Sequence, residues 1–288
     1  MRFTVLSHAG LHVEHAGTSL VFDPWLVGSC YWRSWWNFPE PSPELVASLR
    51  PDFIYLTHLH WDHFHGPSLK RIVQPHTRFL VPRVPNGRML RDLQSLGYFN
   101  IIEIPHGSQF RLGDDFDLWS WQLGPNDDSA ACVVADGVTL LNANDCKLFG
   151  ATLTQVVRRF PRVDFVFKSH SSASAVPHCI EDHERLLPGM RDAHHYIDAF
   201  CEFAVDVKAR HAIPFASSHC YLHDETRRFN QLAVLPTDVR KRFADFAAER
   251  SLDAECVVMP AGSAWDSRDG FDIVEFDYAN AADLLDDY

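Results

Sequence analysis

Four side chains that commonly bind metal ions lie within six positions of this sequence. They are His58, His60, Asp62 and His63, in the segment THLHWDHFHG at positions 57–66. Imidazole nitrogens and carboxylate oxygens are donors that zinc and iron accept in proteins. A histidine-rich surface turn is the alternative, but the H-x-H-x-D-H pattern at the end of an apolar segment favours a metal site.

The segment before this motif indicates a buried strand that positions it. Residues 52–57, DFIYLT, are mostly apolar, aromatic or β-branched. If the strand geometry continues to His60, then His58 and His60 point to the same side, because side chains alternate with period two. Asp62 and His63 follow on the turn and can present a second pair of donors. The pattern therefore predicts half of a dinuclear site.

A dinuclear site needs further donors, and later strand ends supply candidates. Asp145 follows the apolar residues 140–141, and its carboxylate could bridge two metals; an Asx turn or a helix cap is the alternative. Asp127 and Asp128 precede an expected strand, again with a cap or turn as the alternative. The candidates for the last ligand are His170, His219 and His223, each of which, taken alone, is more often a structural histidine.

Length and composition set limits on the class of protein. The chain has 288 residues, 46% of them hydrophobic, which is enough for one large domain or two small ones with a buried core. The net charge of −12 argues against nucleic acid or an anionic membrane as a partner. It does not exclude an anionic substrate, because two dications add about four positive charges at the site.

The cysteines and the N-terminus bear on the cellular location. The seven cysteines are scattered and form no C-x-x-C pair, so neither a disulfide framework nor a cysteine-rich zinc site is indicated. The sequence starts directly as a strand, without a signal peptide, and no apolar run is long enough to span a bilayer. We therefore expect reduced thiols and a cytoplasmic protein.

Two strand-rich stretches, each followed by helices, predict two packed sheets with helices outside. Strands are expected at 3–6, 19–22, 52–57, 78–81, 101–104, 116–121, 131–134, 139–142, 165–168 and 257–259. Helices are expected at 43–49, 68–72, 90–96, 148–159, 181–208 and 239–250, and an acidic solvated tail at 283–288.

An aromatic loop at residues 26–43 is a candidate substrate-binding segment. Its rings could be a core cluster, but its prolines make a lid or pocket wall at least as probable. Arg33 is the only cation in the loop and could pair with a carboxylate or phosphate, while Trp35 and Trp36 could stack on a ring or clamp an acyl chain.

The H-x-H-x-D-H turn and the strand-end Asp145 resemble the metallo-β-lactamase superfamily, and within it the CMP-N-acetylneuraminate hydroxylase group. The matching stretches, in the same order, are DPWLVG (23–28) followed by Trp35-Trp36, DFIYLTHLHWDH (52–63) with PSL (67–69), PNDDS (125–129), LNANDC (141–146) and PFA (214–216). The resemblance implies an α/β fold, an αββα four-layer sandwich. We expect one domain over 1–288 with a helical C-terminal elaboration at about 175–255.

The resemblance also implies a set of ligands. His58, His60, Asp62, His63 and Asp145 are implied to bind metal. Asp128 stands where many superfamily members place a histidine, in a GHT-type motif that this chain lacks. For the last ligand, the common superfamily pattern points to His170, whereas the hydroxylase-like alignment matches His223.

One departure from the hydroxylase group concerns electron supply. Those enzymes resemble a fusion with a Rieske iron–sulfur domain, which needs C-x-H and C-x-x-H pairs. Here Cys220 and His223 form a lone C-x-x-H, and no C-x-H exists. If the protein activates oxygen, electrons must come from another protein or from the substrate.

These expectations favour a dinuclear metal-dependent enzyme, with Asp62 and Asp145 as catalytic residues. Imidazole suits zinc and iron alike, whereas added carboxylates favour harder ions such as iron or manganese. Asp128 would be a third carboxylate, so we favour a non-haem di-iron oxygenase that acts on a small polar metabolite. The alternatives are a zinc hydrolase of an ester, lactone or phosphodiester, and a metal-stabilised binding module without turnover.

Overall fold

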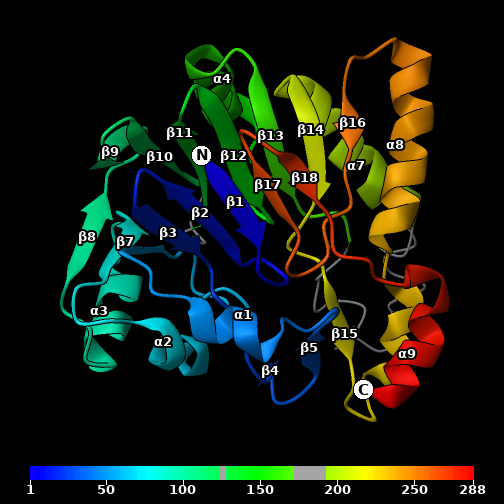
Figure 1. The fold of residues 1–288 in the computed structure, drawn as a ribbon, viewed down its shortest axis with the longest axis horizontal. Coiled ribbons are helices and arrows are strands. Elements are labelled where there is room, and N and C mark those ends of the chain that lie inside the picture. Colours follow the sequence, from blue (N-terminus) through cyan, green and yellow to red (C-terminus); the bar gives the residue numbers. More distant parts are fainter. Residues whose placement is uncertain (124–127, 172–192) are drawn as a thin grey trace.

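Two large β-sheets pack face to face, and helices pack on their outer sides (Figure 1). The computed structural model describes residues 1–123, 128–171 and 193–288. The first sheet contains, in spatial order, β18 (Gly270–Asp272), β17 (Ala264–Asp266), β1 (Arg2–Val5), β2 (Leu11–His15), β3 (Thr18–Phe22), β6 (Phe53–Tyr55), β7 (Arg78–Pro82) and β8 (Ile101–Ile104). Strands β3, β6, β7 and β8 run parallel to one another.

The second sheet is assembled mainly from the middle of the chain. Its order is β16 (Glu255–Cys256), β14 (Ala209–Pro214), β13 (Val163–Lys168), β12 (Val138–Asn144), β11 (Asp128–Ala135), β10 (Phe116–Leu123) and β9 (Ser108–Gly113). Strands β12, β13, β14 and β16 are parallel, and the others pair antiparallel.

A small third sheet connects distant parts of the chain. It consists of β15 (His219–Tyr221), β5 (Trp35–Asn37) and β4 (Ser29–Cys30), all paired antiparallel. The α-helices of the described residues are α1 (Pro43–Ser48), α2 (Gly66–Ile72), α3 (Arg88–Ser95), α4 (Gly150–Arg159), α7 (Ala193–Asp206), α8 (Pro236–Arg250) and α9 (Ala281–Asp287), and 3-10 turns cover η2 (Arg227–Leu232) and η3 (Tyr278–Asn280).

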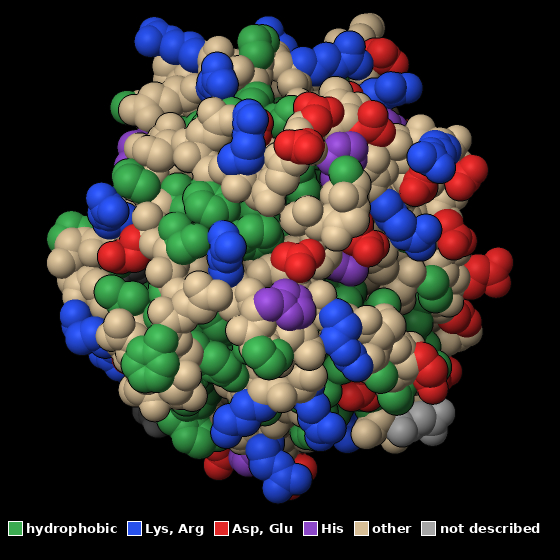
Figure 2. Space-filling model, turned by 60° about the vertical axis from the view of Figure 1, so that its left-hand side comes forward, with side chains coloured by type: hydrophobic (Ala, Val, Ile, Leu, Met, Phe, Trp, Pro, Cys, Tyr) green, Lys and Arg blue, Asp and Glu red, His purple; other side chains and the backbone are tan. Residues whose placement is uncertain are grey.

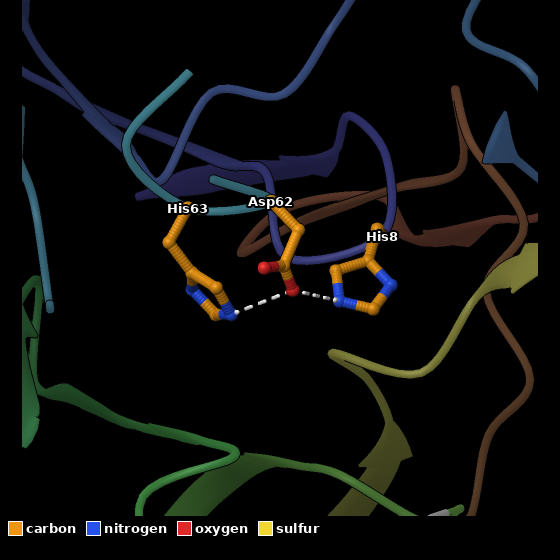
Figure 3. Close-up of side chains that lie close together, drawn as sticks. All are labelled: His8, Asp62 and His63. Atoms are coloured by element: carbon orange, nitrogen blue, oxygen red, sulfur yellow. Dashed lines mark ion pairs between the residues drawn. The ribbon is translucent and has the colours of Figure 1, made fainter. Parts of the chain in front are cut away.

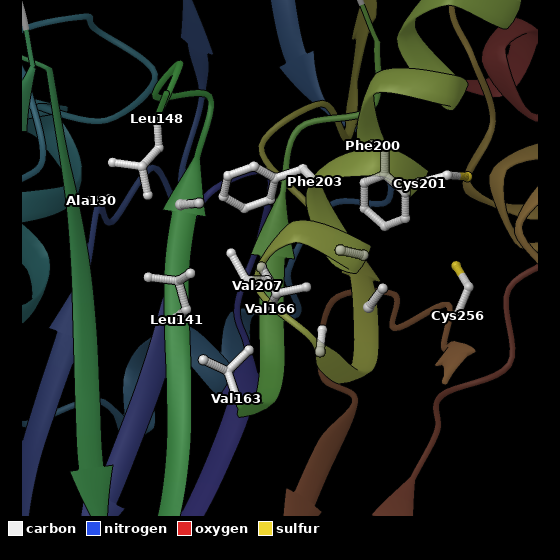
Figure 4. Packing of buried hydrophobic residues seen from close by; sticks show 14 of the residues in the cluster. Ala130, Leu141, Leu148, Val163, Val166, Phe200, Cys201, Phe203, Val207 and Cys256 are labelled. Atoms are coloured by element: carbon white, nitrogen blue, oxygen red, sulfur yellow. The ribbon is translucent and has the colours of Figure 1, made fainter. Parts of the chain in front are cut away.

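Three hydrophobic clusters fill the three interfaces that four layers create. Between the sheets, Phe3 packs edge-to-face on Phe165 with ring centroids 4.9 Å apart. Outside the first sheet, α1, α2 and α3 cover one cluster. Outside the second sheet, side chains of β11–β13 such as Leu141 pack against Phe200 and Phe203 of α7 (Figure 4). This arrangement confirms the expected α/β, αββα sandwich.

Alternation along β6 links the core to the motif that follows it. Phe53 and Tyr55 belong to the cluster between the sheets, whereas Ile54 belongs to the cluster under the helices. This is the period of two expected for a strand that is buried on both faces. The hydroxyl of Tyr55 lies 2.6 Å from Ser120 Oγ of the opposite sheet, so a hydrogen bond between the sheets holds the end of β6.

The carboxyl ends of the parallel strands gather the polar segments singled out in the sequence. The H-x-H-x-D-H motif follows β6, Asp145 follows β12 and His170 follows β13. In open α/β sheets, ligands bind outside the carboxyl ends of the strands. The topology therefore predicts that the site lies at this edge.

Some expected elements differ from the structure. The motif strand ends at Tyr55 rather than at 57, and the last predicted strand forms at Glu255–Cys256 instead of 257–259. Residues 281–287, expected in part as a solvated tail, form α9, whose Leu284 and Leu285 pack against a buried cluster. Of the helix predicted at 181–208, the part before 193 lies outside the described residues. The single domain and its helical elaboration at about 175–255 remain predictions; β14 and β15 also lie in that range.

The surface and the helices bear on the expected partners. On the face that Figure 2 shows, acidic and basic side chains are interspersed with hydrophobic ones. Within the described residues, no helix is both long enough and apolar enough to cross a membrane. The expectations of a cytoplasmic location and of no nucleic-acid or membrane partner remain predictions.

Candidate metal centre

Two groups of three potential ligands lie side by side at the carboxyl ends of the strands. We call His8, Asp62 and His63 the closed group, because all three are buried. We call His58, His60 and Asp145 the open group, because His60 is exposed and Asp145 is partly exposed. Within each group the potential ligand atoms lie within 4.8 Å of one another.

The closed group is centred on one carboxylate oxygen (Figure 3). Asp62 Oδ2 lies 3.1 Å from His8 Nε2 and 3.4 Å from His63 Nε2. The two imidazoles approach this oxygen from opposite sides, His8 from the turn after β1 and His63 from the turn after β6. Two nitrogens and one oxygen that converge in this way could hold one cation.

The open group pairs the first two histidines of the motif with the strand-end aspartate. His58 Nε2 lies 2.8 Å from His60 Nδ1 and 3.6 Å from Asp145 Oδ2. The structure therefore brings His58 and His60 together as the alternation predicted, although regular strand geometry has already ended. Whether these residues bind metal remains a prediction.

Asp145 connects the two groups. Its Oδ1 lies 3.5 Å from His63 Nε2 of the closed group, and its Oδ2 faces His58 of the open group. A carboxylate with one oxygen toward each position is the arrangement required to bridge two cations. The side chain is 29% exposed, so this bridge lies at the boundary between the protein interior and solvent.

A buried carboxylate orients the motif histidines. Asp23, with an exposed fraction of 0%, accepts hydrogen bonds from Thr57 N at 2.8 Å, from Thr57 Oγ1 at 2.7 Å and from His63 Nδ1 at 2.8 Å. Thr57 Oγ1 also lies 3.0 Å from His58 Nδ1. With their Nδ1 atoms engaged, His58 and His63 turn their Nε2 atoms to the site. Carboxylates that hold the far nitrogen of a metal-binding histidine are common in metalloproteins.

A tight turn between β1 and β2 presents His8. A β-carbon added at Gly10 would lie 2.6 Å from Ser7 Oγ, so a residue without a side chain fits this turn. The backbone N–H of His8 donates to Asn37 Oδ1 at 3.1 Å, and its carbonyl accepts from Ala216 N at 2.7 Å. Two distant segments therefore fix the backbone position of His8.

The turn that carries Asp145 is held by an ammonium group. Lys168 Nζ donates to the carbonyl of Cys146 at 2.8 Å and to that of Asn144 at 3.3 Å, on both sides of Asp145. Asn144 adopts a φ of 34°, which asparagine tolerates better than most residues, and its Oδ1 accepts from Cys146 N. The bridge position is thus set by the backbone around it.

The two groups have opposite electrostatics. Burial, and then the neighbouring His63, lower the pKa of His58 to about 4. Burial also opposes the charge of His63, but Asp145, Asp62 and Asp23 raise its pKa well above the ordinary value. Burial disfavours the Asp62 carboxylate, but His63 and His8 hold its pKa well below its usual range. Without metal, the surroundings of the closed group therefore favour the imidazolium form of His63, whereas burial favours the neutral imidazole of His58.

Several polar atoms of the two groups are buried without a hydrogen bond inside the described residues. They include His8 Nδ1, His63 Nε2 and Asp145 Oδ1. Burying polar atoms without a partner is costly. His63 Nε2 and Asp145 Oδ1 face each other at 3.5 Å, where a shared cation would satisfy both. The donor types and their convergence fit two divalent metal ions.

The remaining predicted ligands occupy different surroundings. Asp128 lies near the open group: burial and the charge of Asp145 raise its pKa, while His60 acts in the opposite direction. Asp127 lies outside the described residues. His170 is buried, with neither ring nitrogen hydrogen-bonded in the described part of the chain.

His219 and His223 lie on and after β15 in contrasting positions. The ring of His219 is buried and lies 5.3 Å from the ring of His8. His223 is exposed, and its Nδ1 accepts from Glu225 N, so it caps a turn. The structure does not place His223 in either group, and its role as a ligand stays a prediction.

The aromatic loop combines a core cluster with exposed rings. Trp35 is buried and stacks on His219 with centroids 3.8 Å apart and planes at 10°. Trp36 is half-buried, and its Nε1 donates to the carbonyl of Arg33. Arg33 is exposed, as is the adjacent Trp32, with an exposed fraction of 80%. Trp35 therefore lines the wall of the site, and Arg33 and Trp32 face solvent.

Sequence reasoning missed His8, Asp23 and Tyr31 as parts of the site. His8 follows an apolar strand, as His58 and His170 do, and this shared position was the available signal. Tyr31 Oη donates to Asp62 Oδ1 at 2.5 Å. Nothing in the local sequence pairs Tyr31 with Asp62 or Asp23 with His63.

Comparison with known proteins places these features in context. No family model matches the chain. It is 28% identical over 279 residues to a Mycobacterium tuberculosis protein whose name assigns it to the Rieske 2Fe-2S iron–sulfur proteins, a match covering 92% of this chain and 53% of that protein. It is also 28% identical over 152 residues to the Mus musculus cytidine monophosphate-N-acetylneuraminic acid hydroxylase, covering 51% and 26%. The chain thus spans about half, or less, of these relatives.

Solved structures show the fold. CmlA, a diiron β-hydroxylase from Streptomyces venezuelae, superimposes with a TM-score of 0.62 at 17% identity, covering 90% of this chain and 53% of CmlA. An isothiocyanate hydrolase from Delia radicum gut bacteria gives 0.61 at 15% identity, covering 92% and 99%. The metallo-β-lactamase fold protein YhfI from Bacillus subtilis gives 0.57 at 14% identity, covering 92% and 98%. These likenesses confirm the resemblance inferred from the motifs.

Proposed function

We propose that this chain, which has the metallo-β-lactamase fold, is an enzyme that holds two divalent metal ions side by side and acts as a di-iron oxygenase on a small polar metabolite. The observation that carries the proposal is the position of Asp145. One of its oxygens faces the closed group and the other faces the open group. This arrangement favours a dinuclear site over two independent mononuclear ones.

Each residue of the two groups has a distinct role in this proposal. His8, Asp62 and His63 would hold the closed position, and His58 and His60 would hold the open one, with Asp145 between them. Two iron ions bound here would supply the activation of dioxygen and the delivery of one oxygen atom to a substrate carbon. Because His60 is exposed and Asp145 partly so, substrate would approach from the open side.

The choice of iron rests on the number of carboxylates. Asp62 and Asp145 belong to the two groups, and Asp128 interacts electrostatically with His60 and Asp145. A third oxygen donor at the open position favours a harder ion than zinc, with manganese as a further candidate. The CMP-N-acetylneuraminic acid hydroxylases and the diiron CmlA support the same chemistry by likeness only.

Hydroxylation also requires an electron source. One oxygen atom of dioxygen enters the substrate and the other leaves as water, which consumes two electrons and two protons from outside. We propose that an external electron-donor protein supplies the electrons. The iron–sulfur name of the Mycobacterium tuberculosis relative, of which this chain matches 53%, motivates this partner.

Substrate recognition is assigned to the aromatic loop. Arg33 is exposed beside Trp32 and could pair with an anionic group of the substrate. Trp35 and Trp36 contribute the wall behind it. Replacing Arg33 with alanine should therefore weaken substrate binding and leave metal content unchanged; a loss of metal would mean that the loop is structural.

A zinc-dependent hydrolase of an ester, lactone or phosphodiester is the second candidate. The isothiocyanate hydrolase matches this chain over nearly the whole length of both proteins, whereas CmlA is matched over about half of its length. With zinc in the same ligands, a metal-bound hydroxide would serve as the nucleophile. This candidate requires no electron donor.

Metal analysis combined with oxygen uptake separates the two candidates. Protein produced without added zinc should contain about two irons per chain and consume oxygen when a chemical reductant is supplied. His60→Ala should lose both properties in part, whereas His76→Ala, a surface histidine with a side chain 58% exposed, should keep them. Two zincs per chain, with no oxygen uptake under any reductant, would contradict the oxygenase and favour the hydrolase.

A further inference from the structure

A tyrosine outside both groups contacts the metal-facing carboxylate of the closed group. Tyr31 Oη donates to Asp62 Oδ1 at 2.5 Å. The other oxygen, Asp62 Oδ2, is the atom that faces His8 and His63. An ionised carboxylate can only accept a hydrogen bond, so the phenol is the donor in this contact. The contact therefore fixes which oxygen of Asp62 points into the site.

The backbone that presents Tyr31 is strained. Tyr31, Trp32 and Arg33 have φ angles of 50°, 55° and 68°, so three consecutive residues with β-carbons occupy the left-handed region. Such residues visit this region singly and rarely in a row. Strain of this kind persists where surrounding contacts determine the conformation, and it often occurs at functional sites.

Packing on two sides holds the ring of Tyr31 over Asp62. Its ring is stacked on Trp61, with centroids 5.8 Å apart and planes at 13°. Its other neighbour, Trp35, lies edge-on at 4.9 Å. Cys30 Sγ donates to the carbonyl of Trp61 at 3.2 Å, which ties the strand before the turn to the metal-binding motif. The ring is thus preorganised before any metal binds.

We propose that Tyr31 is a positioning residue that sets the metal affinity of the closed position by orienting Asp62. The inference rests on the proposed dinuclear site and adds to it a residue from a different segment of the chain. A hydrogen bond to a ligating carboxylate fixes its orientation and is worth roughly 10–100-fold in metal affinity. Because Tyr31 touches Asp62 and neither His58 nor His60, its effect should be confined to one of the two ions.

The test is a competition titration of the metal-free chain with Zn²⁺ and a chromophoric chelator, which yields two stepwise affinities. Tyr31→Phe removes only the hydroxyl and keeps the stacked ring. We expect the affinity of one ion to fall by roughly 10-fold or more and that of the other to stay unchanged. Tyr98→Phe, which removes a tyrosine hydroxyl beside Phe79 in another cluster, should change neither affinity.

Background variants assign the effect to one position. In His60→Ala, which keeps the closed group, Tyr31→Phe should still weaken the remaining ion. In His8→Ala, which keeps the open group, it should have no effect. If a background variant fails to fold, the stepwise affinities of the otherwise unaltered chain decide the question.

The outcomes separate this inference from the function on which it rests. A chain that binds no second Zn²⁺ contradicts the dinuclear site itself. Two bound ions with affinities unchanged in Tyr31→Phe, or lowered equally at both positions, contradict the role of Tyr31 and leave the dinuclear site intact.

Discussion

The closed and open groups are built from the same short motif, yet solvent reaches them unequally. Asp62 and His63 are buried and are joined by His8 from another turn. His58 is buried, but its partner His60 is exposed. Solvent therefore reaches the motif at His60, whereas His58, Asp62 and His63 lie in the protein interior.

The difference lies in how each side chain is anchored. In the closed group, Asp23 holds His63, Tyr31 holds Asp62, and Asn37 holds the backbone of His8. In the open group, His60 lies against His58 and otherwise faces solvent. A rigid position beside an accessible one suits an enzyme that keeps one ion fixed while substrate approaches the other. Two groups with the same types of ligand therefore differ in rigidity and in access to solvent.

The largest effect should come from the residue that both groups share. Asp145→Ala removes an oxygen donor from each position and leaves His58 and His63 without their common carboxylate. We expect loss of both ions and of activity, measured by elemental analysis of the purified chain. Asp253→Ala, at a fully exposed carboxylate, is the control. Retention of two ions in Asp145→Ala would mean that the groups bind metal independently.

A matched pair of histidine variants should remove one ion each. His8→Ala removes a donor from the closed group, and His60→Ala removes one from the open group. Each variant should therefore hold about one ion per chain. Because His8 is buried and His60 exposed, we also expect His8→Ala to lower the melting temperature more. If either variant lost metal equally at both positions, the two groups would not be separate binding positions.

Asp23→Asn should weaken the closed position more than the open one, because Asp23 contacts His63 directly and reaches His58 only through Thr57. The variant keeps the size of the side chain but weakens the acceptor that orients His63, and such changes lower metal affinity by roughly 10–100-fold. Asp52→Asn is a matched control, since Asp52 also accepts a backbone hydrogen bond, from Ser19 N at 2.9 Å. Stepwise Zn²⁺ titration checks the result; an equal fall in affinity at both positions would contradict separate anchoring.

The smallest expected effect is a dependence of metal affinity on pH. In the metal-free chain the pKa of His63 is raised and that of His58 is lowered to about 4. A cation must displace the proton of His63 but meets His58 already neutral. Affinity at the closed position should therefore gain about a tenfold rise per pH unit from His63 up to its pKa, whereas His58 adds no such rise at the open position near neutrality. Calorimetry in buffers of different ionisation enthalpy measures the proton release.

The layered fold was predictable because hydrophobic periodicity is a local property. The alternation of Phe53, Ile54 and Tyr55 indicates a strand covered on both faces, and the structure assigns them to two clusters as expected. The short strands β4, β5 and β15 were missed, because they pair only with one another and their residues show no alternation. Helix α9 was missed because its acidic residues outweigh Leu284 and Leu285 in composition.

The proximity of the motif residues and Asp145 could also be predicted, and the contributions of His8, Asp23 and Tyr31 could not. His58 and His60 are two residues apart, so alternation places them on one side, and the structure brings them together although β6 ends at Tyr55. His8 follows β1 and Asp62 follows β6, with β2 and β3 between these strands in the first sheet, so their contact depends on the strand order. Tyr31 reaches Asp62 through a left-handed turn that contains no glycine or asparagine, so the local sequence does not indicate this turn.

The small sheet of β4, β5 and β15 has a consequence for biosynthesis. Its strands pair Trp35 with Tyr221, so the wall behind the site joins segments that leave the ribosome far apart in time. Protein chains emerge at roughly 5–20 residues per second, and the first sheet can begin to fold while the later residues are still being made. The nascent chain thus contains every histidine and aspartate of both groups before β15 is made, and β5, which until then can pair only with β4, must wait for its second partner strand.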